Sequence, residues 1–148
     1  MIKELLTRDT IRFEEGAESW EDAIRLGAEP LIDLGVVDKG YIDDIIANVH
    51  KHGPYIVICP GFALSHARSE HVHAVGMSYL RLGEPVNILD RADRSAHVIL
   101  TLAACDNSSH LQAMRDLSRV LKKDDFLKRF LNCQTPECVL DIINDALD

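Results

Sequence analysis

The sequence predicts an α/β fold in which a mixed sheet of four to five strands lies between two layers of helices. Three observations carry this prediction. Helical periodicity covers residues 19–52, continuous apolar runs of strand length follow between residues 55 and 105, and helical periodicity then returns. Helices, strands and helices in this order are typical of a three-layer α/β/α sandwich. The chain has 148 residues and no repeat or linker, so residues 1–148 are expected to form one domain.

The N-terminal part of the chain predicts two helices. Ser19 is a good N-cap for the first, and Asp22 is its capping-box partner. Pro30 lies inside this helix and should kink or interrupt it, because proline lacks the N–H group of a helical hydrogen bond. Asp38 is expected to cap a second helix, whose apolar residues recur at helical spacing over residues 41–49.

Strand candidates occupy the middle of the chain, after a short one near the N-terminus. They are Ile11–Phe13, Tyr55–Cys59, Phe62–Leu64, Val75–Leu82 and His97–Cys105. The run Tyr55–Cys59 is apolar at every position, which is typical of a central strand. The segment Gly83–Ser95 contains Pro85 and several charged residues, and it predicts a solvated loop.

The C-terminal part predicts three helices. Asp106–Ser109 offers several N-cap residues for the first, whose apolar face extends over Leu111–Leu121. A short helix with two phenylalanines follows. Thr135, with Pro136 at the first helical position, is a good start for the last helix.

Composition narrows the class of protein. A net charge of −8 argues against a nucleic-acid partner, which needs clustered Lys and Arg. No apolar stretch approaches the roughly 18–20 residues of a membrane helix, and the first residues lack the layout of a secretory signal. The four cysteines, Cys59, Cys105, Cys133 and Cys138, match no metal-ligand spacing. We therefore expect a cytoplasmic protein with reduced thiols.

A polar stretch rich in histidine follows the turn at residues 60–61. His66, His71 and His73 lie close together in it, beside Arg68 and Glu70. Polar groups that follow a buried strand need water or a hydrogen-bond partner. The stretch is therefore either a solvated loop or a reaction site.

His66 and His110 are expected to meet at one edge of the sheet. His66 follows a short strand, and His110 lies in the first turn of a helix after the longest strand. That helix start favours an anion, Arg68 adds a forked donor for phosphate, and Ser65 and Ser109 are further candidate phosphate ligands. A neutral imidazole can attack without a separate base. His66 is therefore predicted to be a phosphohistidine nucleophile, with His110 positioning the phosphate.

Other interpretations stay open at this stage. A single histidine in a loop is commonly just solvated. His66, His71, His73 and Glu70 are ligand types that zinc accepts, but their spacing matches no helical zinc motif, so no metal or cofactor is predicted. A thiol nucleophile is disfavoured, because no cysteine lies in a polar setting beside a histidine.

The stretch Ala63-Leu64-Ser65-His66-Ala67 resembles the Ala-aliphatic-Pro-His-Gly/Ala signature of a known family. This family is the type-2 (mannitol/fructose class) enzyme IIA component, EIIA, of the bacterial phosphoenolpyruvate-dependent sugar phosphotransferase system (PTS). The flanks Gly53-Pro54-Tyr55, Pro60-Gly61 and Arg68 are most similar to its ascorbate-specific branch. Trp20, Ala103–Asp106 and His110 also lie where such proteins have them, so the resemblance covers nearly the whole chain.

The resemblance implies a mannitol-type IIA fold and a cytoplasmic phosphoryl carrier. His66 would accept a phosphoryl group from the phosphocarrier protein HPr and pass it to a cysteine of a IIB component, which serves a IIC permease. His110 would position the group. Ascorbate, or a related sugar acid or pentitol, is the expected cargo. The resemblance is also compatible with a homodimer.

Ser65 departs from the family pattern, which has proline at this position. Proline would fix φ just before His66, whereas serine loosens that approach and adds a hydroxyl group. The segment 70–73 also departs from the family's usual loop. These departures motivate an alternative function, a regulatory IIA-like interaction module that signals phosphorylation state without sugar transport.

Overall fold

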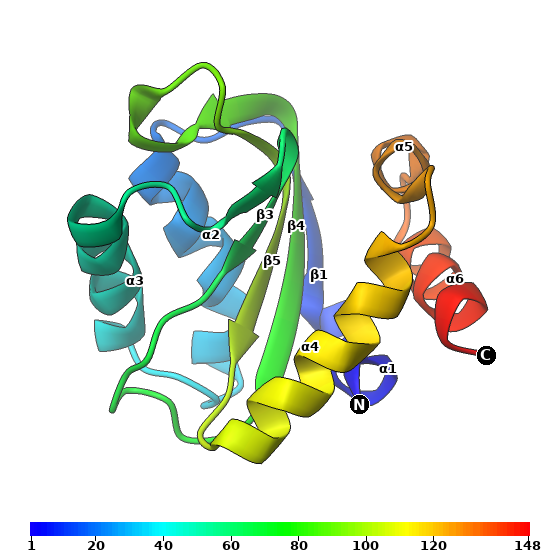
Figure 1. Ribbon diagram of the computed structural model, residues 1–148, viewed down its shortest axis with the longest axis horizontal. Helices are drawn as coiled ribbons and strands as arrows, with labels where there is room; N and C mark the ends of the chain where they lie inside the picture. Colours follow the sequence, from blue (N-terminus) through cyan, green and yellow to red (C-terminus); the bar gives the residue numbers. More distant parts are fainter.

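A mixed sheet of five strands forms the centre of the structure, a computed structural model that describes residues 1–148 (Figure 1). The strands are β1 (Ile11–Glu14), β2 (Val57–Cys59), β3 (Gly61–Ser65), β4 (Gly76–Asn87) and β5 (Ser95–Ala103). Their order across the sheet is β1-β4-β5-β3-β2. The pairs β1–β4 and β3–β5 are parallel, and the pairs β4–β5 and β2–β3 are antiparallel. The predicted mixed sheet is confirmed.

Helices cover both faces of this sheet (Figure 1). They are α1 (Ile2–Leu5), α2 (Trp20–Asp33), α3 (Gly40–His52), α4 (Asn107–Leu121), α5 (Phe126–Asn132) and α6 (Pro136–Leu147). One apolar core lies between the sheet and α2 and α3, and a second lies between the sheet and α1, α4, α5 and α6. The predicted three-layer architecture is therefore confirmed. None of these helices combines the length and the apolar character needed to cross a membrane.

The strand β3 is short but buried on both faces. Phe62 and Leu64 belong to the core beneath α4, α5 and α6, whereas Ala63 belongs to the core beneath α2 and α3. Side chains alternate along a strand, so Ser65 points to the same face as Ala63. Because both faces are packed, the end of β3 is a rigid base for His66.

The strand β2 lies at the edge of the sheet, so the prediction of a central strand over Tyr55–Cys59 is wrong. β2 begins only at Val57 and pairs with β3 alone. The side chain of Ile58 is 48% exposed. An apolar run shows that a strand can be buried, but it does not show how many strands will pair with it.

The strand β4 is longer than the sequence predicted. It extends to Asn87, into the segment expected to be a loop. Its pairing with β5 is irregular between Arg81 and Val86. Pro85 lies in this irregular part, where the N–H group that proline lacks is not needed for a regular ladder.

Pro30 does not interrupt α2, because a distant side chain replaces the lost hydrogen bond. The missing N–H of Pro30 leaves the carbonyl group of Leu26 without its helical donor. Nη1 of Arg12, on β1, donates to this carbonyl oxygen over 3.2 Å and also contacts Glu29 over 2.9 Å. The helix therefore continues to Asp33.

Three of the predicted helix starts are confirmed. Ser19, Asp106 and Thr135 are the N-caps of α2, α4 and α6, and each side chain accepts a hydrogen bond from a backbone N–H of the first turn. The start of α3 differs by one residue, because its N-cap is Lys39. Asp38 still accepts a hydrogen bond from Gly40 N–H over 2.9 Å.

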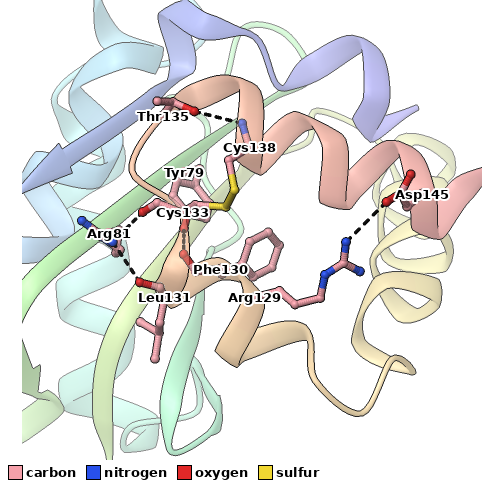
Figure 2. Close-up of a disulfide and its surroundings, with 9 residues drawn as sticks. All are labelled: Tyr79, Arg81, Arg129, Phe130, Leu131, Cys133, Thr135, Cys138 and Asp145. Atoms are coloured by element: carbon pink, nitrogen blue, oxygen red, sulfur yellow. Dashed lines mark hydrogen bonds and ion pairs between the residues drawn. A yellow bond between two sulfur atoms is a disulfide. The ribbon is translucent and has the colours of Figure 1, made fainter.

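Cys133 and Cys138 form a disulfide, so the prediction of reduced thiols is wrong for this pair (Figure 2). The chain turns back between α5 and α6, and this turn places the two Cα atoms 5.5 Å apart, within disulfide range. Arg81 holds the same turn by donating to the carbonyl groups of Leu131 and Cys133 over 3.0 and 2.6 Å. Cys59 and Cys105 are free thiols.

Candidate functional site

A pocket of about 860 Å³ opens at the carboxyl ends of β3 and β5. These strands are parallel neighbours, so the segments that follow them emerge at the same edge of the sheet. The start of α4 and the end of α3 complete the walls. The polar and aromatic residues that line the pocket are Asn48, His52, Tyr55, His66, Arg68, Ser69, Glu70, Asp106, Asn107 and His110.

His66 and His110 face each other in this pocket. Their ring centroids are 6.2 Å apart, and the ring planes are tilted by 41°. His66 is the first residue after β3, and His110 lies in the first turn of α4. The structure thus brings together the two histidines that the sequence placed at one edge of the sheet.

The His66 ring has one nitrogen hydrogen-bonded and one nitrogen available. Its Nδ1 lies 2.8 Å from the carbonyl oxygen of Leu64. A carbonyl oxygen can only accept, so Nδ1 carries the hydrogen and Nε2 carries the lone pair. Burial lowers the pKa of His66 below its ordinary value, the Leu64 hydrogen bond opposes this shift, and nearby His110 adds to it. His66 is therefore a neutral imidazole at neutral pH, with Nε2 as its nucleophilic atom.

Two tyrosines that the sequence assigned to apolar packing contact the backbone at His66. The Tyr55 hydroxyl donates to the carbonyl oxygen of His66, and its ring packs edge-on against the imidazole at 5.4 Å between centroids. The buried Tyr41 hydroxyl accepts a hydrogen bond from Ala67 N–H over 3.3 Å. A buried phenol needs a hydrogen-bond partner. A tyrosine within an otherwise aliphatic segment, in α3 for Tyr41 and before β2 for Tyr55, is therefore the signal that the sequence offers, but it does not identify the partner of the hydroxyl.

Arg68 lines the pocket as predicted, whereas Ser65 does not. Arg68 is exposed and forms no ion pair in the structure, so its guanidinium is available for an anion in the pocket. The Ser65 side chain is fully buried on the sheet face that α2 and α3 cover, and Ser65 is in register with Thr101 of β5. The prediction that the Ser65 hydroxyl binds phosphate is therefore corrected, because the alternation of side chains along β3 directs it away from the pocket.

Both donor groups of Ser109 are occupied by the N-cap of α4. Its N–H donates to Oδ1 of Asp106 over 2.7 Å, and its hydroxyl donates to Oδ2 over 3.2 Å. These bonds lower the pKa of Asp106, so the N-cap of α4 is a carboxylate at neutral pH. In this structure Ser109 therefore serves the N-cap of α4, and its role as a phosphate ligand stays a prediction. Because the carboxylate of Asp106 gives the start of α4 a negative charge, the helix start is less suited to bind an anion. Arg68 is therefore the principal cation of the pocket.

His71 and His73 do not line the pocket that contains His66 and His110. Nδ1 of His71 and Nε2 of His73 lie 2.7 and 2.9 Å from the two carboxylate oxygens of Asp38. The hydrogen bond to Asp38 raises the pKa of His71. The zinc interpretation required these histidines to converge with His66, and the structure has no group of three or more such side chains placed to hold a metal ion. Through their contacts with Asp38, His71 and His73 instead anchor the segment 66–75 to the start of α3.

Residues 4–146 match the family model described as phosphoenolpyruvate-dependent sugar phosphotransferase system, EIIA 2. The chain belongs to this EIIA family. A curated relative, the ascorbate-specific PTS system EIIA component of Shigella boydii serotype 4 (strain Sb227), is 30% identical over 142 residues, which are 95% of this chain and 92% of the relative. The similarity to the ascorbate-specific branch is therefore confirmed, and EIIA membership supports a role as a phosphoryl carrier.

Solved structures of IIA proteins share the fold of this EIIA chain. A PTS IIA domain from Streptococcus pyogenes M1 GAS is 35% identical with a TM-score of 0.90, over 100% of this chain and 98% of that chain. A second structure with a similar fold comes from the complex of enzyme IIAMTL with phosphorylated enzyme IIBMTL from Escherichia coli. It is 22% identical with a TM-score of 0.80, over 95% of this chain and 97% of that chain. Because the identity is only 22%, this second likeness shows a shared fold and nothing more.

The EIIA pocket also contains residues that sequence patterns did not select. Asn48 and His52 come from the last turns of α3, and Cys105 directly precedes the N-cap of α4. A histidine at the end of a helix, such as His52, is explained from sequence alone as a favourable charge at the helix C-terminus. These residues reach the pocket because α3 ends beside the exit of β3, a tertiary relationship that no local spacing reveals.

Proposed function

We propose that this EIIA chain is a cytoplasmic phosphoryl carrier of a sugar phosphotransferase system, with residues 1–148 as one type-2 domain. Nε2 of His66 accepts a phosphoryl group from HPr and passes it to a cysteine of a IIB component. The observation that supports this most directly is the Nδ1 hydrogen bond of His66 to Leu64, which leaves Nε2 free in the pocket.

The chemistry needs no group beyond the side chains present. The lone pair of Nε2 forms the new N–P bond while the bond between phosphorus and the donor breaks, and the imidazole then carries a positive charge. Transfer to a thiolate reverses this, because the N–P bond breaks and the neutral imidazole returns. Negative charge on the equatorial oxygens is stabilised by donors placed around them. His110 and Arg68 supply those donors from two sides of the pocket.

The choice of partner and cargo rests on the relatives. The Escherichia coli complex pairs enzyme IIAMTL with a phosphorylated IIB enzyme, which supports a IIB component as the acceptor here. The ascorbate specificity of the curated relatives supports ascorbate, or a related sugar acid or pentitol, as the cargo of the system. The sugar is then bound by the IIB–IIC partners, and the EIIA pocket holds only the phosphoryl group and the partner residues that deliver or remove it.

Phosphoryl labelling tests this proposal. The protein is incubated with phosphoenolpyruvate, enzyme I and HPr, and acid-labile phosphate is measured on the wild type, on His66→Ala and on His97→Ala. We expect one phosphoryl group on the wild type and none on His66→Ala. His97 is a suitable control, because it is half-buried and contacts the Gly83 carbonyl outside the pocket. Equal labelling of His66→Ala and the wild type would contradict the proposal.

A chase with a IIB protein separates the carrier from the alternative, a regulatory module. The departure at Ser65 from the family's proline motivates that alternative. A carrier loses its label to the IIB cysteine, whereas a module that only signals phosphorylation state retains it. Retention of the label in the presence of an active IIB protein would therefore favour the regulatory function.

A further inference from the structure

The peptide group between His66 and Ala67 is held at both of its polar atoms by tyrosine hydroxyls. The Tyr55 hydroxyl donates to the carbonyl oxygen of His66. The N–H of Ala67 donates to the Tyr41 hydroxyl over 3.3 Å. Tyr41 comes from α3 and Tyr55 from the segment before β2, so two separate parts of the chain fix the orientation of one peptide plane.

Tyr41 also connects the two halves of the pocket. Its hydroxyl donates to the carbonyl oxygen of Leu102 on β5 over 2.5 Å, while it accepts from Ala67. One hydroxyl group donates once and can accept as well, so both bonds form together. The residues after β3 are thereby tied to the end of β5, the strand that leads to His110.

Tyr55 constrains the imidazole as well as the backbone. Its ring meets the His66 ring edge-on, with 83° between the planes. A second contact that constrains the imidazole ring is the hydrogen bond from Nδ1 to the carbonyl oxygen of Leu64, two residues earlier on β3. The ring can rotate only if one of these contacts breaks, so Nε2 keeps its direction.

We propose that Tyr41 and Tyr55 are positioning residues for phosphoryl transfer at His66. They fix the His66–Ala67 peptide group so that the Nδ1–H of His66 stays on Leu64 and Nε2 points into the pocket. Ser65, unlike a proline, does not restrict φ before His66, so the restraint comes from the residues that follow. This inference goes beyond the proposed function, and only its kinetic consequence depends on that function.

The chemistry explains why such positioning has a large effect. Phosphoryl transfer requires the attacking atom in line with the breaking bond, and a displacement of about 1 Å can lower a rate by about 100-fold. Burial raises the pKa of both Tyr41 and Tyr55, so both hydroxyls keep their hydrogen at neutral pH. Neither tyrosine needs to touch the phosphoryl group to have this effect.

The test uses Tyr41→Phe and Tyr55→Phe, which remove only the hydroxyl groups. Tyr79→Phe is the matched control. Tyr79, like Tyr41, is fully buried, but its hydroxyl is 3.5 Å from the Phe130 carbonyl, in the core on the α5 side of the sheet. The first measurement is the ¹⁵N NMR spectrum of the unphosphorylated His66 ring, which distinguishes the two neutral tautomers. The second is the single-turnover rate of labelling by phosphorylated HPr.

We expect the wild type and Tyr79→Phe to show the Nδ1–H tautomer alone. Tyr41→Phe and Tyr55→Phe should show a mixture, and their labelling rate should fall by about 10- to 100-fold at saturating donor with the KM for the donor unchanged. If both variants keep the pure Nδ1–H tautomer, the inference is overturned. A wild type that shows this tautomer but cannot be labelled would defeat the proposed function and leave the positioning inference supported by the NMR result.

Discussion

The imidazole rings of His66 and His110 lie 6.2 Å apart, centroid to centroid. His66 directly follows β3, and His110 lies in the first turn of α4, which follows β5, the parallel neighbour of β3. This spacing leaves room for a phosphoryl group attached to one ring to be contacted by the other. His110 should therefore stabilise the charge that develops on the transferred group without carrying the group itself.

Replacing His110 tests this role. His110→Ala should still be labelled on His66, but the labelling rate should fall by about 100- to 1,000-fold, which corresponds to about 2.7–4 kcal/mol for loss of a preorganised donor. His50→Ala is a suitable control, because His50 packs against Trp20 and lies outside the pocket. A wild-type labelling rate in His110→Ala would show that His110 takes no part in transfer.

The two kinds of histidine should titrate in opposite directions from the ordinary value of about 6.5. Burial lowers the pKa of His66, and the hydrogen bond to Asp38 raises the pKa of His71. As pH rises, the His66 ring should therefore lose its proton first. Proton NMR of the ring resonances measures both midpoints. The prediction is contradicted if His71 titrates at the lower pH.

These shifts also fix the sign of two effects on stability. His71 has a raised pKa, so its bond to Asp38 stabilises the fold below about pH 6.5 and is lost as pH rises through the raised value. His66 has a lowered pKa, so protonation at low pH destabilises the fold.

The labelling rate should likewise fall as pH drops through the lowered pKa of His66, because the protonated ring has no lone pair. A rate that stays constant through that titration would argue against neutral His66 as the nucleophile.

Reduction of the Cys133–Cys138 disulfide should lower stability without affecting the site. A loop this short predicts a loss of about 2 kcal/mol, since closing it constrains the unfolded chain only modestly. Urea unfolding with and without a thiol reductant measures this difference. The double variant Cys133→Ala, Cys138→Ala is the control and should not respond to the reductant. A wild-type midpoint that is also insensitive would show that the disulfide does not form in solution.

Two buried serines in one row of the sheet provide a test of the corrected Ser65 assignment. Ser65 and Ser78 both lie opposite Thr101, and both are fully buried. The Ser78 hydroxyl donates to the Gly27 carbonyl over 2.5 Å, whereas the Ser65 hydroxyl has no partner. Ser78→Ala should lose about 1 kcal/mol of stability, and Ser65→Ala should be neutral or stabilising with an unchanged labelling rate. Slower labelling in Ser65→Ala would restore a role for the hydroxyl in transfer.

The sequence predicted the architecture and the proximity of His66 and His110, because both depend on local patterns. Apolar runs identified the strands. His66 directly follows one strand, and His110 lies in the first turn of the helix that follows another, so placing those strands side by side was enough to bring the histidines together. The burial of Ser65 follows from the alternation along β3, a consequence that the resemblance to the family signature obscured.

The remaining features depend on contacts between distant residues. Pro30 stays helical because Arg12 reaches the carbonyl group of Leu26 from β1. The Cys133–Cys138 pair depends on the turn between α5 and α6. The hydroxyls of Tyr41 and Tyr55 find their partners only when α3 and the segment before β2 pack beside the end of β3. No sequence spacing contains that information.

The most direct measurement is the identity of the phosphorylated atom. Labelled protein, kept at alkaline pH to preserve the phosphoramidate bond, is examined by ³¹P and ¹⁵N NMR with ¹⁵N in the histidine rings. Because Nδ1 of His66 donates to Leu64, the phosphoryl group should be on Nε2 of His66 alone. Phosphate on Nδ1 of His66, or on any other residue, would contradict the proposal that Nε2 of His66 is the carrier atom.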